Sequence, residues 1–141
     1  MCSFLIANLF CQRVASLLAG IWDTAGQERY SAMSRIYLRG TKAALVCFDV
    51  LSEETFERAK QWIGEVREIE PESEIYLVGC KSDTATPDAG GRVDSAAVRK
   101  LAASVGGHVH ETSAKTGKGV DELFFAVADD WLKAQVRCEC M

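Results

Sequence analysis

The chain has 141 residues, a length that fits one domain with a substantial hydrophobic core. Its composition, 48% hydrophobic and 26% charged, is ordinary for a globular protein. The 16 basic and 20 acidic residues are spread along the chain and give a net charge of −4, so the sequence has no basic stripe of the kind that binds nucleic acid.

Residues 1–13 form an atypical apolar leader. Arg13 is the single charged residue among the first 20. A secretory signal places its basic residues before the apolar core, whereas Arg13 follows it. A transmembrane span needs about 20 predominantly apolar residues without such an interruption. We therefore expect neither, and predict a strand over residues 14–22 after the leader.

A strand and a helix are predicted in the middle of the chain. Residues 42–50 are an apolar run with β-branched and aromatic members, which is typical of a strand buried on both faces. Ser52 is placed to cap a helix, and Glu53 and Glu54 follow it where the helix dipole favours acids. The apolar residues of this helix recur at helical spacing and predict one face packed on the sheet: Phe56, Ala59, Ile63, Val66 and Ile69.

The same alternation continues in the second half. Residues 74–80 predict a buried strand and residues 84–92 a loop rich in glycine and proline. Asp94 is placed to cap a helix that ends at Gly106. Its predicted apolar stripe is Val98, Leu101, Ala102 and Val105.

A short strand over residues 109–112 and a helix over about residues 120–136 complete the predicted elements. The inward side of this helix is expected to hold Val120, Leu123, Phe124, Val127, Trp131 and Ala134. Strand–helix alternation of this kind predicts an α/β sheet that binds its ligand at the carboxyl ends of the strands.

The six cysteines favour reduced thiols over a disulfide framework. Cys47 and Cys80 lie in apolar runs predicted as strands, where a thiol acts as a small hydrophobic side chain. Cys138 and Cys140 lie at the C-terminus, where the sequence offers no obvious further metal ligands. Such usage favours a cytoplasmic protein.

Three short segments fall directly after three predicted strands, where this architecture places a ligand. They are DTAGQE at residues 23–28, CKSD at 80–83 and ETSAK at 111–115. In this order the chain resembles the Ras superfamily of small GTPases over roughly residues 14–136. The run from Ile21 to Tyr30 is similar to the Rab branch in particular. The resemblance implies a P-loop NTPase-like, three-layer α/β sandwich.

The first segment has expected roles at the phosphate end of a nucleotide. By resemblance, Asp23 holds Mg²⁺ through a water molecule. Gly26 offers its backbone N–H to the γ-phosphate of GTP. Gln27 is the catalytic residue and orients the attacking water, although an exposed turn residue is the plainer alternative.

The other two segments have expected roles at the guanine base. Lys81 lays its aliphatic stem over the ring, and the Asp83 carboxylate accepts two N–H bonds from the guanine edge, which adenine cannot supply. Ser113 and Lys115 support the base, and the Ala114 backbone N–H contacts its carbonyl oxygen. As an isolated pattern, Lys81 and Asp83 are simply loop charges. Their position among the other motifs favours the binding role.

Two histidines on the last predicted strand have a plainer interpretation. His108 and His110 alternate along it, and a structural or exposed role is expected rather than metal ligation.

The chain departs from the family pattern in two ways. Cys80 stands where the family usually has Asn, and a thiol is a weaker hydrogen-bond partner. In addition, no segment of the 141 residues matches the phosphate-binding pattern G-x-x-x-x-G-K-[ST]. We therefore expect an incomplete, N-terminally truncated GTPase domain over residues 14–136. Residues 3–10 are expected to fill the central slot of its sheet as a surrogate strand, or to cover the sheet as a short helix.

These observations lead to a Rab-like small GTPase with severely weakened GTP/GDP and Mg²⁺ binding. The alternatives are a non-hydrolysing fragment that presents the second-switch surface (Tyr30, Met33, Ile36 and Tyr37), or a non-functional splice or gene-model product. The resemblance implies Rab effectors and regulators as partners and a monomer. Cys138 and Cys140, in the tail at residues 137–141, are candidates for prenylation, which would attach the protein to endomembranes.

Overall fold

The computed structural model describes residues 4–11, 17–24, 38–84 and 92–139. Their strands are β1 (Phe4–Cys11), β2 (Leu17–Thr24), β3 (Ala43–Asp49), β4 (Glu74–Cys80) and β5 (His108–Glu111). Their helices are α2 (Glu53–Ile69), the 3₁₀ turn η2 (Ser82–Thr84), α3 (Ser95–Val105) and α4 (Val120–Glu139). The strands and helices alternate from β3 onward, as the sequence predicts.

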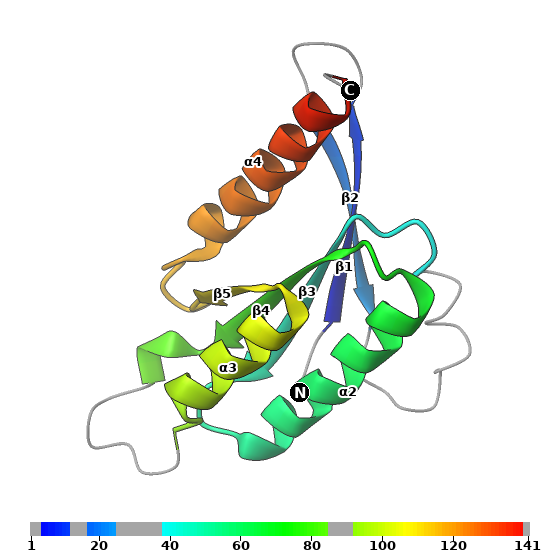
Figure 1. Ribbon diagram of the computed structural model, residues 1–141. Helices are drawn as coiled ribbons and strands as arrows, with labels where there is room; N and C mark the ends of the chain where they lie inside the picture. Colours follow the sequence, from blue (N-terminus) through cyan, green and yellow to red (C-terminus); the bar gives the residue numbers. More distant parts are fainter. Residues whose placement is uncertain (1–3, 12–16, 25–37, 85–91, 140–141) are drawn as a thin grey trace.

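The described strands form one sheet in the order β2-β1-β3-β4-β5. Helices α2 and α3 cover one face of the sheet and α4 covers the other, which gives three layers (Figure 1). This arrangement confirms the predicted three-layer α/β fold. Strand β2 lies at one end of the sheet, and no described strand pairs with its outer edge.

Strand β1, in the centre of the sheet, runs antiparallel to both of its neighbours. It pairs antiparallel with β2 along its whole length and antiparallel with β3, whereas β3, β4 and β5 are mutually parallel. It follows that β2, β3, β4 and β5 all point the same way. Their carboxyl ends therefore share one edge of the sheet, and the carboxyl end of β1 lies at the opposite edge.

Of the two structures expected for residues 3–10, the surrogate strand is confirmed. β1 lies between the strand that enters the DTAGQE segment and the next strand of the sheet, and the two blue strands of Figure 1 form a hairpin. Its hydrogen-bonded neighbours, β2 on one side and β3 on the other, give it a central place in the sheet.

The caps predicted for two helices are present. The Ser52 side chain accepts a hydrogen bond from the N–H of Thr55 at the start of α2. The Asp94 side chain does the same for Ala96 in α3, and Gly106 ends that helix in the left-handed conformation, with φ of 64°. These contacts satisfy backbone groups that a helix end leaves unpaired.

Two hydrophobic clusters fill the layers on either side of the sheet. The cluster beneath α2 and α3 contains Phe56, Ile63, Val66 and Val98, and the cluster beneath α4 contains Tyr76, Leu123 and Val127. These positions match the predicted apolar stripes. Ala134 is exposed rather than inward, because the buried part of α4 runs only from Leu123 to the half-buried Trp131.

Several boundaries differ from those predicted. β2 ends at Thr24, two residues beyond the expected strand, and so continues into the DTAGQE segment. α4 continues to Glu139, so residues 137–139 are helical rather than part of a separate tail. No glycine or proline interrupts residues 120–139, and the backbone has no local reason to leave the helix earlier. No helix within the described ranges is both long and apolar enough to cross a membrane.

Candidate functional site

The CKSD segment turns sharply at the end of β4. Lys81 has φ of 62°, and within the described residues it is the one non-glycine residue with a positive φ. A lysine in the left-handed region is strained, and such strain is held in place by surrounding contacts. Here the following N–H, that of Ser82, donates to the carbonyl of Thr112 at 3.0 Å, which joins the CKSD loop to the ETSAK loop.

A second hydrogen bond joins the two loops through side chains. The hydroxyl of Ser113 donates to Oδ1 of Asp83 at 2.6 Å, and the same oxygen of Ser113 accepts the N–H of Thr116 at 3.3 Å. Ser113 is fully buried, whereas Asp83 is exposed. The bond from Ser113 lowers the pKa of Asp83, with a smaller contribution from Lys115. The Asp83 carboxylate is therefore ionised at neutral pH and directed by a buried partner.

The Lys81 side chain turns back toward β3. Its Nζ lies 2.5 Å from Oδ2 of Asp49, and Oδ1 of Asp49 accepts the N–H of Leu51 at 2.9 Å. The ammonium group lowers the pKa of Asp49, and the carboxylate raises the pKa of Lys81. Sequence reasoning missed Asp49. Its position as the last residue of a strand at the ligand-binding edge was the available signal.

The ETSAK loop closes in a tight turn. Ala114 and Lys115 are exposed at its tip, and the carbonyl of Ser113 accepts the N–H of Gly117 at 2.8 Å. Gly119 has φ of 75°, and a Cβ at that position would lie 2.1 Å from the carbonyl oxygen of Glu111. A side chain at this position would therefore require a shift of the backbone near Glu111.

The remaining predicted site residues are only partly described. Asp23 lies in β2, paired with Leu5, and so belongs to the edge at which the parallel strands end. Gly26 and Gln27 lie outside the described residues, as does the predicted second-switch surface. Cys138 lies near the end of α4, and Cys140 lies outside the described residues.

Cys80 occupies the end of β4, where the family pattern has Asn. Its Sγ accepts a hydrogen bond from the hydroxyl of Thr112 at 3.9 Å. Cys47 and Cys80 are both thiols, as the sequence analysis predicts. Cys47 is buried and Cys80 is partly exposed. The CKSD loop is thus tied to Thr112, the residue after β5, by a sulfur contact and by the backbone bond from Ser82.

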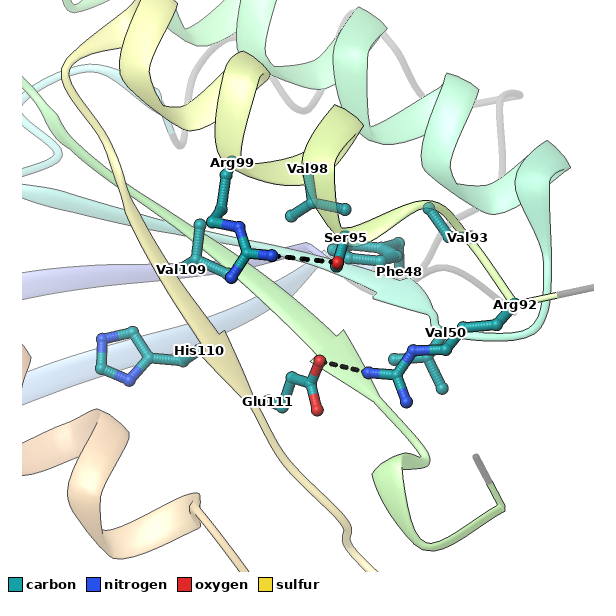
Figure 2. A pocket seen from close by; sticks show the side chains of 10 residues that line it. All are labelled: Phe48, Val50, Arg92, Val93, Ser95, Val98, Arg99, Val109, His110 and Glu111. Atoms are coloured by element: carbon teal, nitrogen blue, oxygen red, sulfur yellow. Dashed lines mark hydrogen bonds and ion pairs between the residues drawn. The ribbon is translucent and has the colours of Figure 1, made fainter. Parts of the chain in front are cut away.

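A pocket of about 70 Å³ opens beneath the start of α3, on the α2 and α3 face (Figure 2). Its floor is apolar and includes Phe48, and its rim holds an ion pair between Arg92 and Glu111 with a distance of 2.5 Å. Arg99 at the rim donates to the hydroxyl of Ser95 at 3.1 Å. None of the predicted base-contacting residues lines this pocket. Both arginines already have partners, so the pocket is a packing feature beside the candidate site rather than part of it.

The two histidines of β5 lie on the side of α4. His108 stacks on Tyr76, and its Nε2 lies 3.7 Å from carboxylate oxygens of both Glu74 and Asp130. The Tyr76 hydroxyl donates to Asp130 at 2.9 Å, and burial together with this carboxylate raises the pKa of Tyr76. Burial, together with the charge of His108, lowers the pKa of His110. No group of three or more potential ligands suited to a metal ion occurs among the described side chains.

Comparison with known proteins identifies the family. The family model described as "Ras family" matches residues 3–133. The chain belongs to the Ras family. The "Ras-related protein Rab-24" of Dictyostelium discoideum is 41% identical over 117 residues, which cover 83% of this chain and 58% of the relative. The "Ras-related protein Rab-5A" of the same organism is 41% identical over 124 residues, or 87% of this chain and 60% of the relative.

These matches place the chain in the Rab branch of the small GTPases. Proteins of this family in general bind a guanine nucleotide with Mg²⁺ and act through effectors and regulators. The chain spans less than two thirds of the length of these two relatives. The family match begins at residue 3 and so includes β1, which the sequence analysis set apart as a leader.

Proposed function

We propose that this chain recognises guanine through the CKSD and ETSAK loops and binds the whole nucleotide only weakly. The observation that supports base recognition is the 2.6 Å bond from the buried Ser113 hydroxyl to Asp83. It fixes an ionised carboxylate at the strand-end edge, and a carboxylate accepts the paired N–H groups of guanine. Lys81 lies over the base, Lys115 flanks it, and the Ala114 N–H meets its carbonyl oxygen.

Weak binding follows from what the base contacts can contribute. About four hydrogen bonds at about 0.5–1.5 kcal/mol each give a few kcal/mol. Association costs at least about 4 kcal/mol, and nanomolar affinity needs about −12 kcal/mol. The 141 residues contain no G-x-x-x-x-G-K-[ST] segment to supply the difference through phosphate contacts.

The direction of β1 supports the same proposal. A phosphate-binding loop follows the carboxyl end of its strand, at the edge where the base-binding loops also lie. β1 is antiparallel to β3, so the chain leaves it at the other edge. We assign Asp23, near the end of β2, to a Mg²⁺ site by resemblance, where Mg²⁺ would neutralise charge at the phosphates. We therefore propose negligible GTP hydrolysis, with Gln27 and Gly26 lacking a bound phosphate to act on.

Affinity is tested by calorimetry of GTP and GDP on the purified chain. We expect no binding at micromolar concentrations. A dissociation constant of about 1 μM or tighter would show that the weak-binding proposal is wrong.

Base recognition is tested separately by ligand-observed NMR at millimolar nucleotide. The NMR signal that reports contact of the nucleotide with the protein should be stronger for GTP than for ATP. Asp83→Ala should lower the signal of GTP to that of ATP. Asp121→Ala, an exposed carboxylate in the first turn of α4, is the matched control and should leave GTP unchanged. Equal contact of GTP and ATP with the unaltered chain would contradict base recognition.

A second candidate function is a non-hydrolysing fragment that presents the second-switch surface to Rab effectors. The sequence feature that favours it is the retained run from Tyr30 to Tyr37 in a chain without the phosphate-binding pattern. Purified effectors should bind the chain without nucleotide, and substitution of Met33 and Ile36 by Asp should abolish the binding. Equal binding by the substituted chain would exclude this surface.

Attachment to endomembranes from the cytoplasm is proposed only through lipidation of Cys138 or Cys140. Cys138-Glu139-Cys140-Met141 has the length of a C-a-a-X prenylation signal, but its two middle residues are Glu and Cys rather than aliphatic residues. Intact-mass measurement of the chain isolated from cells tests this directly. An unmodified C-terminal peptide in the membrane fraction would contradict it.

A further inference from the structure

Two cysteines lie side by side where β3 and β4 approach the ligand-binding edge. In the register of these parallel strands, Cys47 is opposite Val78 and Cys80 is opposite Asp49, so Cys80 lies two residues further along. Residues two apart in a strand share a face. Both thiols accordingly pack against the cluster beneath α4, with Cys47 in it and Cys80 at its margin.

The two thiols share one face of paired strands and differ in their exposure. The Cys80 Sγ accepts a hydrogen bond from the Thr112 hydroxyl, and the thiols of Cys47 and Cys80 each donate to a carbonyl of their own strand, those of Leu45 and Val78. Cys47 is 7% exposed and lies within the sheet, whereas Cys80 is partly exposed at the last position of β4. A reagent from solvent therefore meets Cys80 first, and Cys47 is the nearest described thiol that can react with the product.

We propose that Cys47 and Cys80 form a redox-sensitive pair, in which Cys80 is oxidised by a peroxide and Cys47 converts the product to a reversible intramolecular disulfide. In the first step the Cys80 thiolate attacks one oxygen of hydrogen peroxide, the O–O bond breaks, and the released hydroxide takes a proton to become water. Cys80 is then a sulfenic acid.

In the second step the Cys47 sulfur attacks the Cys80 sulfur. The S–O bond breaks, the proton of the Cys47 thiol goes to the departing hydroxide, and a second water leaves. The two steps together oxidise two thiols to one disulfide and reduce one peroxide to two water molecules. A dithiol reductant reverses the change by thiol–disulfide exchange.

The electrostatics around Cys80 support the first step. Hydrogen bonds from Cys47 and Thr112, with a contribution from the Lys81 ammonium, lower the pKa of Cys80 to about 7 against burial and the Asp49 carboxylate. The thiolate is the species that reacts with peroxide. A substantial fraction of Cys80 is consequently reactive at neutral pH, whereas an ordinary cysteine with a pKa of about 8.5 is mostly protonated.

The strand geometry favours a labile bond over a structural one. Cys47 and Cys80 are diagonal rather than directly opposite on paired strands, so their Cα atoms are further apart than those of an opposite pair, whereas a relaxed disulfide prefers about 4.4–6.8 Å. Closure must draw the end of β4 toward β3, and strained disulfides are easily reduced. The moved residue directly precedes Lys81, so oxidation would also displace the loop of Asp83. This last consequence rests on the proposed base recognition, whereas the disulfide itself does not.

The test uses the unaltered chain and a variant in which Cys2, Cys11, Cys138 and Cys140 are replaced by Ser. Both are treated with hydrogen peroxide and mapped by mass spectrometry. We expect a cross-linked peptide pair containing Cys47 and Cys80, lost after dithiothreitol. If both thiols remain reduced, or if peroxide leads only to overoxidised Cys80 without the cross-link, the proposal is wrong.

Single substitutions in the same background assign the two roles. Cys47→Ser should stop the reaction at a sulfenic acid on Cys80 that dimedone traps, and Cys80→Ser should leave Cys47 unreacted. Reaction of Cys47 at an undiminished rate in Cys80→Ser would overturn the order of the steps. Phenylarsine oxide, which bridges close thiols, should bind the pair and neither single variant, and it reports proximity without requiring disulfide geometry.

Hydrogen exchange separates this proposal from nucleotide binding. Oxidation should raise amide exchange at residues 81–84 whether or not the chain binds GTP. Failure of GTP binding would therefore leave the disulfide test intact.

Discussion

The two halves of the sheet differ in what lies at the edge where the parallel strands end. At β4 and β5, two short loops are held together by the bond from Ser113 to Asp83, by the bond from Ser82 to Thr112 and by the turn at Gly119. At β1 and β2, a hairpin occupies the sheet and reverses the direction of its central strand. The β4 and β5 half holds two loops in a fixed arrangement, whereas the β1 and β2 half completes the sheet without such loops among the described residues.

This difference gives the proposed base-binding loops and a phosphate-binding loop separate structural requirements. Each base-contacting loop needs only the end of its own parallel strand and the neighbouring loop. A phosphate loop needs a central strand that points toward the same edge, and β1 points away from it. An apolar strand can therefore complete the sheet of this fold without supplying a phosphate-binding loop.

The largest expected effect comes from breaking the hairpin half. Ile6 pairs with Trp22 on one side and Ala44 on the other, so Ile6→Pro interrupts a strand with neighbours on both sides. An unpaired buried carbonyl alone costs about 1–3 kcal/mol, and the ring also disturbs the adjoining strand. We expect the free energy of unfolding to fall by about 3 kcal/mol or more, as measured by urea denaturation.

Ser95→Pro is the matched control for this prediction. Ser95 is the first residue of α3 after its cap, a position where proline is tolerated because the N–H has no partner within the helix. Its stability should stay close to that of the unaltered chain. Equal stability of Ile6→Pro, or of a chain lacking residues 1–13, would show that β1 is not needed to complete the sheet.

A smaller effect is expected in the half that retains the loops. Gly119→Ala combines a positive φ with a Cβ that would collide with the carbonyl of Glu111, whereas Gly117→Ala has a positive φ of 79° and nothing within 4 Å. The conformational cost is about 1 kcal/mol for both. We expect Gly119→Ala to lose about 1–2 kcal/mol beyond Gly117→Ala because the backbone must shift, with both values measured by thermal or chemical unfolding.

The same comparison can be read by NMR at the loop itself. Chemical shifts of residues 113–118 should change widely in Gly119→Ala and only near the substitution in Gly117→Ala. Matching stabilities for the two variants would mean that the turn does not depend on the close approach of Gly119 to Glu111.

The smallest effect concerns pH and the strand that supports the ETSAK loop. The pKa of His110 is lowered in the folded chain, first by burial and then by the charge of His108, against the opposing effect of Asp130. The unfolded chain therefore binds a proton on His110 first as pH falls. Its contribution to stability is full above the unfolded pKa of about 6.5 and is lost progressively as pH drops through the folded value.

His110→Gln should remove this part of the pH dependence. Urea unfolding at a series of pH values from neutral to mildly acidic should show a shallower decline than in the unaltered chain. His108→Gln is the companion variant, because the Nε2 of His108 lies 3.7 Å from carboxylate oxygens of both Glu74 and Asp130 on the same face of the sheet. An unchanged slope in His110→Gln would contradict the assignment.

The sequence predicted the parts of the fold that depend on local chemistry. Ser52, Asp94 and Gly106 are cap residues whose side chains or backbone freedom act within one helical turn. The apolar spacing of α2 likewise indicated which face is buried. These features lie within a few residues of one another, so a single sequence suffices to identify them.

The sequence did not determine features that depend on distant parts of the chain. The apolar run at residues 3–10 was compatible with a strand or a helix, and its antiparallel direction depends on pairing with β2 and β3. The Asp49 contact with Lys81 joins residues 32 positions apart. That a ligand binds at the edge where the three motifs lie stays a prediction, and the bond from Ser113 to Asp83 there joins residues 30 positions apart.

The outer edge of β2 has a practical consequence for handling the protein. Leu17–Thr24 is an eight-residue strand whose sequence contains neither lysine nor proline, and no described strand pairs with its outer edge. Soluble proteins commonly protect such edges with charge or proline, because unpaired strands join edge to edge. Concentrated preparations should therefore be prone to reversible self-association. Replacement of the half-exposed Ile21 by lysine should reduce it.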